Sequence, residues 1–207
     1  MSTSILQWLQ QLDLSILRWI NQVWTNPFLD WFFPRMAAPS IFLIPGIILG
    51  LGLLWKGRMR GRLFLLLMAV VIGLGDAVIV NGLKKAVNRP RPHETVQGVR
   101  LVTKEEIRIS NPTERPSKGR SFPSAHVSNN VALALVVVAF YGRRYCWIFL
   151  WAFLMGWNRV YLGVHFPSDV LFSIFLSMTY TGLILFVARS ILKRYGIEWS
   201  FREGLRN

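Results

Sequence analysis

Three short clusters of polar residues, each beside a long apolar segment, contain the side chains that are able to do chemistry in this sequence. They read LKKAVNRPRP from residue 83, FPSAH from residue 122 and NRVYLGVHFPSD from residue 158. Guanidinium and ammonium groups match the oxygens of a phosphate monoester, which carries close to two negative charges. Two histidines, an aspartate and several arginines and lysines on one surface form the set that a phosphoryl-transfer site needs.

The second cluster opens an apolar segment, where the first backbone N–H groups of a helix are free to face an anion. Pro123 suits the first turn of such a helix, and Ser124 adds a hydroxyl donor. His126 would stand beside the bound anion, in position to protonate a leaving oxygen. This segment predicts half of an anion-binding site with a general acid attached.

The third cluster predicts a pair formed by His165 and Asp169. Gly163 is a natural helix terminator and Pro167 suits the first position of the next helix, which makes Asp169 its third residue. An acidic side chain there reaches back toward the helix cap. A carboxylate that accepts the ring N–H of a histidine orients it as a nucleophile or general base. The alternative is a histidine paired for solubility at a membrane surface.

Five apolar segments are long enough to cross a bilayer as helices, which takes about 20 residues each. They cover residues 40–55, 63–83, 124–141, 146–163 and 168–190. Hydrophobic residues make up 53% of the 207-residue chain and charged residues 16%, below the roughly 25% of soluble proteins. The sequence predicts an all-α fold, a polytopic membrane helix bundle of five to six transmembrane helices.

The basic residues indicate how this bundle is oriented. The net charge is +14, and Lys and Arg cluster at residues 56–62, at 143–144 and after Arg189. The positive-inside rule places these clusters in the cytoplasm and leaves residues 84–123 and 164–167 outside. All three polar clusters then meet at the outer face. We expect an integral inner (plasma) membrane protein with its site facing the periplasm, a cytoplasmic C-terminus and no nucleic-acid partner.

The chain divides into three parts. They are an N-terminal segment (1–39), a transmembrane domain (40–190) with an outer loop (84–123), and a basic cytoplasmic tail (191–207). Apolar residues near one face of residues 5–23 favour an amphipathic helix in the membrane interface, with a sixth span as the alternative. Within the outer loop, residues 93–120 are either a lid over the site or a solvated connector.

Together, the three clusters resemble the signature of the type 2 phosphatidic acid phosphatase superfamily, KxxxxxxRP, PSGH and SRxxxxxHxxxD. Arg89 also precedes a proline, but the matching lysine position is then Gly82, so Arg91 is the match. Ala125 replaces the usual glycine and keeps the backbone N–H, while Asn158 replaces the usual serine and still donates hydrogen bonds. The matching charged and hydroxyl residues are Lys84, Arg91, Ser124, His126, Arg159, His165 and Asp169.

The resemblance implies a membrane phosphatase that works through a phosphohistidine. His165 would attack phosphorus with Asp169 orienting it, and His126 would protonate the leaving oxygen and then activate water. Fixed cations would stabilise the charge, so neither a metal nor another cofactor is implied. The groups expected to hold the phosphate oxygens are Lys84, Arg91, Ser124, the backbone N–H near Ala125, and Arg159.

The substrate implied by the resemblance is a membrane lipid phosphate or diphosphate. Family analogy suggests undecaprenyl diphosphate, phosphatidylglycerol phosphate, phosphatidic acid or lipid A 1-phosphate, with the first slightly favoured. A lipid-to-lipid phosphotransferase would use the same histidine and remains open. A soluble vanadium haloperoxidase shares the pocket but not the apolar segments, and a non-enzymatic scaffold would not need every charged motif position. The sequence does not indicate an oligomeric state.

Further polar residues are expected near the site. Asn129 and Asn130 lie three and four residues after the histidine of the second cluster, and at least one is predicted to orient that histidine or the phosphate-binding loop. Asp76 lies inside an apolar segment, where an ionisable group is either functional or the partner of a buried donor. Two basic residues flank the first motif and are candidates for a second phosphate or a headgroup: Lys85 and Arg89.

Overall fold

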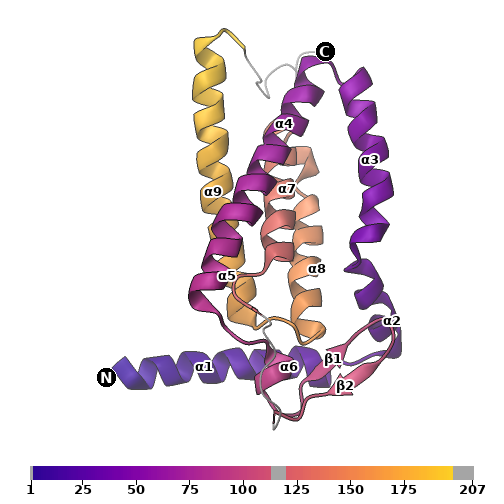
Figure 1. Cartoon of the computed structure of the whole chain (residues 1–207), viewed down its shortest axis with the longest axis vertical. Coiled ribbons are helices and arrows are strands. Elements are labelled where there is room, and N and C mark those ends of the chain that lie inside the picture. Colours follow the sequence, from indigo (N-terminus) through magenta and orange to yellow (C-terminus); the bar gives the residue numbers. More distant parts are fainter. Residues whose placement is uncertain (1, 113–119, 198–207) are drawn as a thin grey trace.

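The computed structural model describes residues 2–112 and 120–197 of the chain. Most of them form a long bundle of helices with a smaller layer across one end (Figure 1). The bundle contains α3 (Pro39–Lys56), α4 (Arg58–Leu74), the π-helix η2 (Gly75–Val80), α5 (Asn81–Val87), α7 (Ala125–Tyr141), η3 (Arg143–Tyr145), α8 (Ile148–Tyr161) and α9 (Pro167–Arg194). The end layer contains α1 (Ser2–Arg18), the π-helix η1 (Trp19–Val23), α2 (Pro27–Met36), α6 (Pro92–Thr95), β1 (Arg100–Val102) and β2 (Ile107–Ile109).

The hairpin of β1 and β2 shows that the prediction of a purely α-helical fold was incomplete. The two strands pair antiparallel, with Arg100 opposite Ile109. Thr103 and Glu106 close the turn, since the Thr103 N–H donates to the Glu106 carbonyl at 2.9 Å and the Glu106 N–H donates to Oγ1 of Thr103 at 3.0 Å. The strands carry the β-branched residues Val102, Ile107 and Ile109, which favour extended backbone. This part of the outer loop is therefore an ordered element, and residues 113–119 lie outside the described residues.

Helix α7 is the centre of the bundle and packs against α4, α8 and α9. Its buried face includes small residues such as Ser128 and Ala132, which allow neighbouring helix backbones to approach closely. Serines of α9 hold the two helices together: Oγ of Ser177 donates to the Ser128 carbonyl at 2.7 Å. Helix α7 is thereby fixed along the first half of α9.

Two described helical segments are long and apolar enough to cross a membrane by length and composition, Arg58–Thr95 and Pro167–Arg194. They contain the predicted spans at 63–83 and 168–190. Two further apolar helices are shorter, Leu43–Lys56 and Ala125–Tyr141. The total of five to six transmembrane helices therefore stays a prediction.

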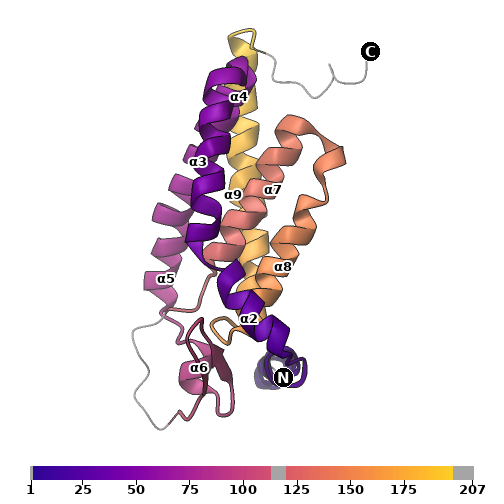
Figure 2. The same cartoon turned by 90° about the vertical axis from the view of Figure 1, so that its right-hand side faces the viewer.

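Helix α1 lies across the end of the bundle and not along it (Figures 1 and 2). Leu6 and Trp8 on its outer side are more than half exposed, whereas Leu17 near its end is completely buried. A helix that anchors one face on the bundle and leaves apolar side chains outside has the form of an interfacial helix. This orientation agrees with the interfacial interpretation of residues 5–23, whose position in a bilayer remains a prediction.

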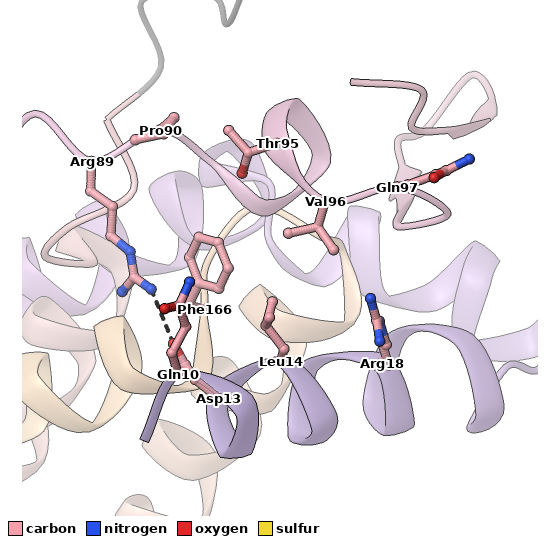
Figure 3. Close-up of a pocket in the computed structure, with 10 residues that line it drawn as sticks. All are labelled: Gln10, Asp13, Leu14, Arg18, Arg89, Pro90, Thr95, Val96, Gln97 and Phe166. Atoms are coloured by element: carbon pink, nitrogen blue, oxygen red, sulfur yellow. Dashed lines mark hydrogen bonds and ion pairs between the residues drawn. The ribbon is translucent and has the colours of Figure 1, made fainter. Parts of the chain in front are cut away.

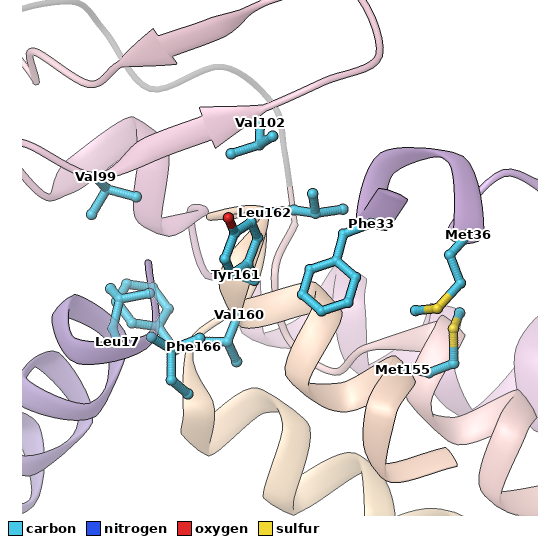
Figure 4. Packing of buried hydrophobic residues seen from close by; sticks show 11 residues of the cluster. Leu17, Phe33, Met36, Val99, Val102, Met155, Val160, Tyr161, Leu162 and Phe166 are labelled. Atoms are coloured by element: carbon cyan, nitrogen blue, oxygen red, sulfur yellow. The ribbon is translucent and has the colours of Figure 1, made fainter. Parts of the chain in front are cut away.

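A buried cluster joins the end layer to the bundle and includes Leu17, Phe33, Val99, Tyr161 and Phe166 (Figure 4). It packs residues of α1, α2 and the hairpin onto the end of α8 and the start of α9. This packing surrounds the connection between α8 and α9, which carries one of the predicted catalytic histidines.

The buried side chain of Asn21 reinforces the same connection. It donates to the carbonyls of Arg100 at 2.8 Å and Tyr161 at 2.7 Å, and accepts the Arg100 N–H at 2.7 Å. Gly163 then turns the chain with a φ of +73°, and a β-carbon at this position would collide with the Arg100 carbonyl. Glycine at 163 therefore meets both a conformational and a steric requirement.

Candidate active site

The structure brings the three polar clusters to the same end of the bundle, beside the end layer. Lys84 lies on α5, Arg91 precedes α6, and His126 lies in the first turn of α7. Arg159 lies near the end of α8, and His165 lies in the connection to α9. The charges of Lys84, Arg159 and His165 all act on His126, and that of Arg91 acts on Lys84, Arg159 and His165. The predicted site residues therefore form one group.

Three predicted phosphate ligands present buried side-chain atoms that have no hydrogen-bond partner among the described residues. These atoms are Nε of Arg91, Oγ of Ser124, and Nε and Nη2 of Arg159. A buried polar group left without a partner costs about 1–3 kcal/mol, so native structures rarely keep several together. Four potential donors at this end of the bundle are what an anionic ligand would satisfy.

The start of α7 differs slightly from the prediction. Ser124 is the N-cap residue with extended backbone, and the helix begins at Ala125, so Pro123 precedes the first turn. The Ser124 N–H donates to Oγ of Ser173 on α9 at 2.7 Å, which fixes this residue in the extended conformation. Its own hydroxyl makes no capping bond and remains available to a ligand.

Ser121 ties the first two clusters together. Its N–H donates to the Arg89 carbonyl at 2.8 Å, and its hydroxyl donates to the Pro90 carbonyl at 3.0 Å. The segment that carries Arg91 and the loop that leads into α7 are therefore joined by direct hydrogen bonds. This explains how motifs that are separated by a long outer loop share one site.

Asp169 is the third residue of α9, as the capping pattern predicts. Its Oδ2 accepts the Phe166 N–H at 2.9 Å and lies 3.7 Å from Nδ1 of His165. That second distance is longer than a hydrogen bond, and Nδ1 has no other partner among the described residues. The carboxylate faces the imidazole, but the predicted ring N–H bond is not formed in this structure.

The other carboxylate oxygen explains the difference. Oδ1 of Asp169 accepts a hydrogen bond from Nη1 of Arg89 at 2.6 Å. Arg89 also pairs with Asp13 through Nη2 at 3.0 Å, and its guanidinium lies over the Phe166 ring. The structure therefore places Arg89 behind the His165–Asp169 pair and not free for a second phosphate or a headgroup. Lys85, the other flanking cation, is exposed.

His165 is buried in the connection between α8 and α9. Burial lowers the pKa of this histidine below its ordinary value of 6.5, although the adjacent Asp169 carboxylate acts in the opposite direction. The positive charges of Arg159 and Arg91 add to the lowering. The neutral imidazole is favoured near neutral pH, and this is the form that acts as a nucleophile.

The asparagines predicted to support the site make contacts with backbone and with other helices. Nδ2 of Asn130 donates to the His126 carbonyl at 2.8 Å, and its Oδ1 accepts from Nε1 of Trp151 at 2.8 Å. Asn158 donates to the Phe33 carbonyl of α2 at 2.8 Å. Oδ1 of Asn129 is buried and has no partner among the described residues. Within the described parts of the chain, none of these hydrogen bonds reaches an imidazole ring.

Asp76 lies in η2, within the continuous helical segment that leads to Lys84. Its charge acts on Lys84 and on Tyr180 of α9, and its Oδ1 is buried without a partner among the described residues. π-Helical turns often occur at functional sites.

Among residues 2–112 and 120–197, no group of three or more His, Cys, Asp or Glu side chains is placed to hold a metal ion.

Comparison with known proteins bears directly on this arrangement. A model of the PAP2 superfamily matches residues 63–192, which contain all three polar clusters. The chain belongs to this superfamily. The membership confirms the family resemblance that the motif spacing indicates.

Individual PAP2 proteins resemble the chain over most of its length. It is 26% identical over 197 residues to a lipid A 4′-phosphatase of Bacteroides thetaiotaomicron, which covers 92% of this chain and 83% of that protein. The crystal structure of Aquifex aeolicus LpxE superposes with a TM-score of 0.65 at 27% identity, covering 84% of this chain and 94% of LpxE.

A transmembrane PAP2-type phosphatidylglycerolphosphate phosphatase from Bacillus subtilis has the same fold. Its TM-score is 0.58 at 24% identity, and the match covers 88% of this chain and 87% of that protein. The PAP2 fold therefore extends beyond the matched motifs to nearly the whole chain.

Proposed function

We propose that this PAP2 protein is an integral membrane lipid phosphatase that transfers the phosphoryl group of its substrate to His165. The observation that carries the proposal is the group of buried, unpartnered donors on Arg91, Ser124 and Arg159 beside two histidines. Such donors stabilise charge on a transferring phosphoryl group most strongly in a site that excludes water. Lys84 adds a further positive charge, so the site would require no metal.

The ring orientation of His165 supports Nε2 as the attacking atom. Because Nδ1 faces Asp169, Nε2 is the nitrogen left for phosphorus. In the first step a P–N bond forms to Nε2 while the P–O bond to the lipid breaks, and protonated His126 gives its proton to the leaving oxygen. In the second step neutral His126 takes a proton from water, whose oxygen attacks phosphorus. The P–N bond then breaks, which releases inorganic phosphate and restores His165.

The position of the site and the similar proteins support a substrate class. A site at one end of an apolar bundle suits a phosphate on a lipid headgroup at the membrane surface. The likeness to a lipid A 4′-phosphatase supports a phosphate monoester on a lipid A-type headgroup as the first substrate to test. The positive-inside rule supports a site at the outer face, in the periplasm of a bacterial cell.

The test is phosphate release by the purified protein in detergent with a chelator present throughout. The panel contains lipid A phosphates, phosphatidylglycerol phosphate, phosphatidic acid and undecaprenyl diphosphate. We expect release from at least one lipid and its loss in His165→Ala. Release that requires an added metal ion, or that survives in His165→Ala, would contradict the mechanism.

The covalent step has a separate test. Substrate carrying labelled phosphate is mixed with the enzyme and quenched in alkali, where phosphohistidine persists. Label should remain on the wild type and be absent from His165→Ala. His93→Ala is the matched control, because Nδ1 of His93 is hydrogen-bonded to the Gly163 carbonyl at 2.9 Å and His93 has no role in the proposed reaction. This variant should retain the labelled phosphate. An enzyme that becomes labelled but releases no phosphate, and that loses its label when a lipid alcohol is added, would be a lipid-to-lipid phosphotransferase.

A further inference from the structure

Asp13 is the only acidic residue of α1, and its side chain is directed at the catalytic end of α9. Only 10% of this side chain is exposed, although α1 otherwise presents many side chains to its surroundings. Oδ1 accepts the Ser168 N–H at 2.8 Å, and Oδ2 accepts the Ser168 hydroxyl at 2.6 Å. Asp13 therefore binds the residue that directly precedes Asp169.

Arg89 connects the two carboxylates. Its Nη2 donates to Oδ2 of Asp13 at 3.0 Å, and its Nη1 donates to Oδ1 of Asp169 at 2.6 Å. Figure 3 shows Asp13 and Arg89 facing each other above α1, beside the ring of Phe166. The guanidinium carbon lies 3.9 Å from the centre of that ring, which restricts how far the guanidinium can move.

One guanidinium shared by two carboxylates holds each of them less strongly than it would hold one alone. If Asp13 were neutral, the full charge of Arg89 would act on Asp169 and draw it away from the imidazole. If Asp13 were absent, Ser168 would lose two hydrogen bonds at the first turn of α9. Either change would alter the 3.7 Å separation between Oδ2 of Asp169 and Nδ1 of His165.

We propose that Asp13 is a positioning residue for phosphoryl transfer: through Arg89 and Ser168 it holds Asp169 in register with His165. The inference rests on the proposed function, because it assigns Asp169 and His165 to the reaction. It also gives α1 a role in the reaction. A shift of this helix, whose apolar side chains are exposed, would move Asp13 and thereby change the positions of Asp169 and His165.

The experiment compares Asp13→Asn with Asp30→Asn by steady-state phosphate release on the best lipid of the panel. Asp30 is a matched control, since it is also a partly buried carboxylate of the N-terminal region paired with a distant arginine, Arg100, at 2.6 Å. Asp13→Asn should lower kcat by about tenfold, the scale of losing a partner that orients a reactive side chain, with KM changed less than about twofold. Asp30→Asn should lower the melting temperature and leave kcat within about twofold of the wild type.

A double variant tests the route of the effect. In an Asp169→Asn background the change Asp13→Asn should cause no further loss of kcat, because the two residues act through one path. Wild-type kcat in Asp13→Asn, a change confined to KM, or an equal loss in the Asp169→Asn background would each overturn the inference while the proposed function stands. A wild type that releases no phosphate would overturn both.

Discussion

Nη1 of Arg89 lies 2.6 Å from one oxygen of Asp169, whereas Nδ1 of His165 lies 3.7 Å from the other. In this structure the carboxylate is held more tightly from behind than it holds the imidazole. Hydrogen bonds between catalytic groups are often long without substrate and shorten in the reacting complex. A negative phosphate beside the imidazole favours such a change, because the ring N–H becomes a better donor as positive charge develops on it.

The first prediction concerns the carboxylate itself. Asp169→Asn keeps the size of the side chain but removes the charge that would stabilise the imidazole as it attacks phosphorus. We expect kcat for phosphate release to fall by about 10²–10⁴-fold, the range between an orienting partner and the aspartate of a catalytic triad. Alkaline quench with labelled substrate should show slower formation of the phosphoenzyme. Unchanged labelling kinetics in this variant would remove Asp169 from the reaction.

The second prediction concerns pH. Burial of His165 lowers its pKa, the charges of Arg159 and Arg91 lower it further, and Asp169 acts in the opposite direction; the net result is a pKa below 6.5. The folded state then binds a proton at this site less readily than the unfolded state. The contribution of His165 to the free energy of unfolding is therefore complete above about pH 6.5 and decreases as the pH falls toward the folded-state pKa.

Activity should follow the same direction, because protonated His165 cannot attack phosphorus. We expect kcat/KM to decline on the acid side of pH 6.5, measured as phosphate release across a series of buffers. The melting temperature of the wild type should also fall more steeply with acidification than that of His165→Ala. If the melting temperatures of the two proteins fell equally between pH 7 and pH 5, the lowered pKa of His165 would be contradicted.

Much of the site follows from the sequence because its determinants are local. The spacing of Pro167 and Asp169 predicts both the start of α9 and the third-position carboxylate, since capping depends only on neighbouring residues. The left-handed glycine at 163 likewise follows from a short pattern. Spacing within motifs also predicts Arg91 and not Arg89 as a phosphate ligand, and the unpartnered Nε of Arg91 is compatible with this prediction.

The contacts that sequence reasoning missed join residues far apart in the chain. Asp13 and Arg89 are separated by 76 positions, and Asn21 and Tyr161 by 140. The apolar pattern of α1 predicts which face is buried, but it contains no information about the partner of its single carboxylate. The hairpin was missed for a different reason, because strands of three residues show too little alternation to be separated from a polar loop.

A third prediction uses the buried guanidinium of Arg159. Arg159→Lys keeps the positive charge but removes the planar set of donors, two of which have no partner among the described residues. We expect kcat/KM to fall by about 10²-fold or more, as when one donor to a developing negative charge is lost. Arg100→Lys is the matched control, because Arg100 pairs with Asp30 in the end layer. This variant should lower the melting temperature but not kcat. Equal kinetic losses in the two variants would mean that Arg159 is only structural.

The last prediction separates support of the helices from support of His126, the proposed general acid. Asn130 binds the His126 carbonyl and the indole N–H of Trp151, so it joins α7 to α8 without touching the imidazole ring. Asn130→Ala removes both bonds, and each hydrogen bond contributes about 0.5–1.5 kcal/mol to stability. We therefore expect a lower melting temperature in detergent with kcat within about threefold of the wild type. A loss of kcat greater than tenfold at an unchanged melting temperature would instead assign Asn130 to the orientation of His126. If Asn130 only joined the two helices, its loss would lower stability before it lowered the reaction rate.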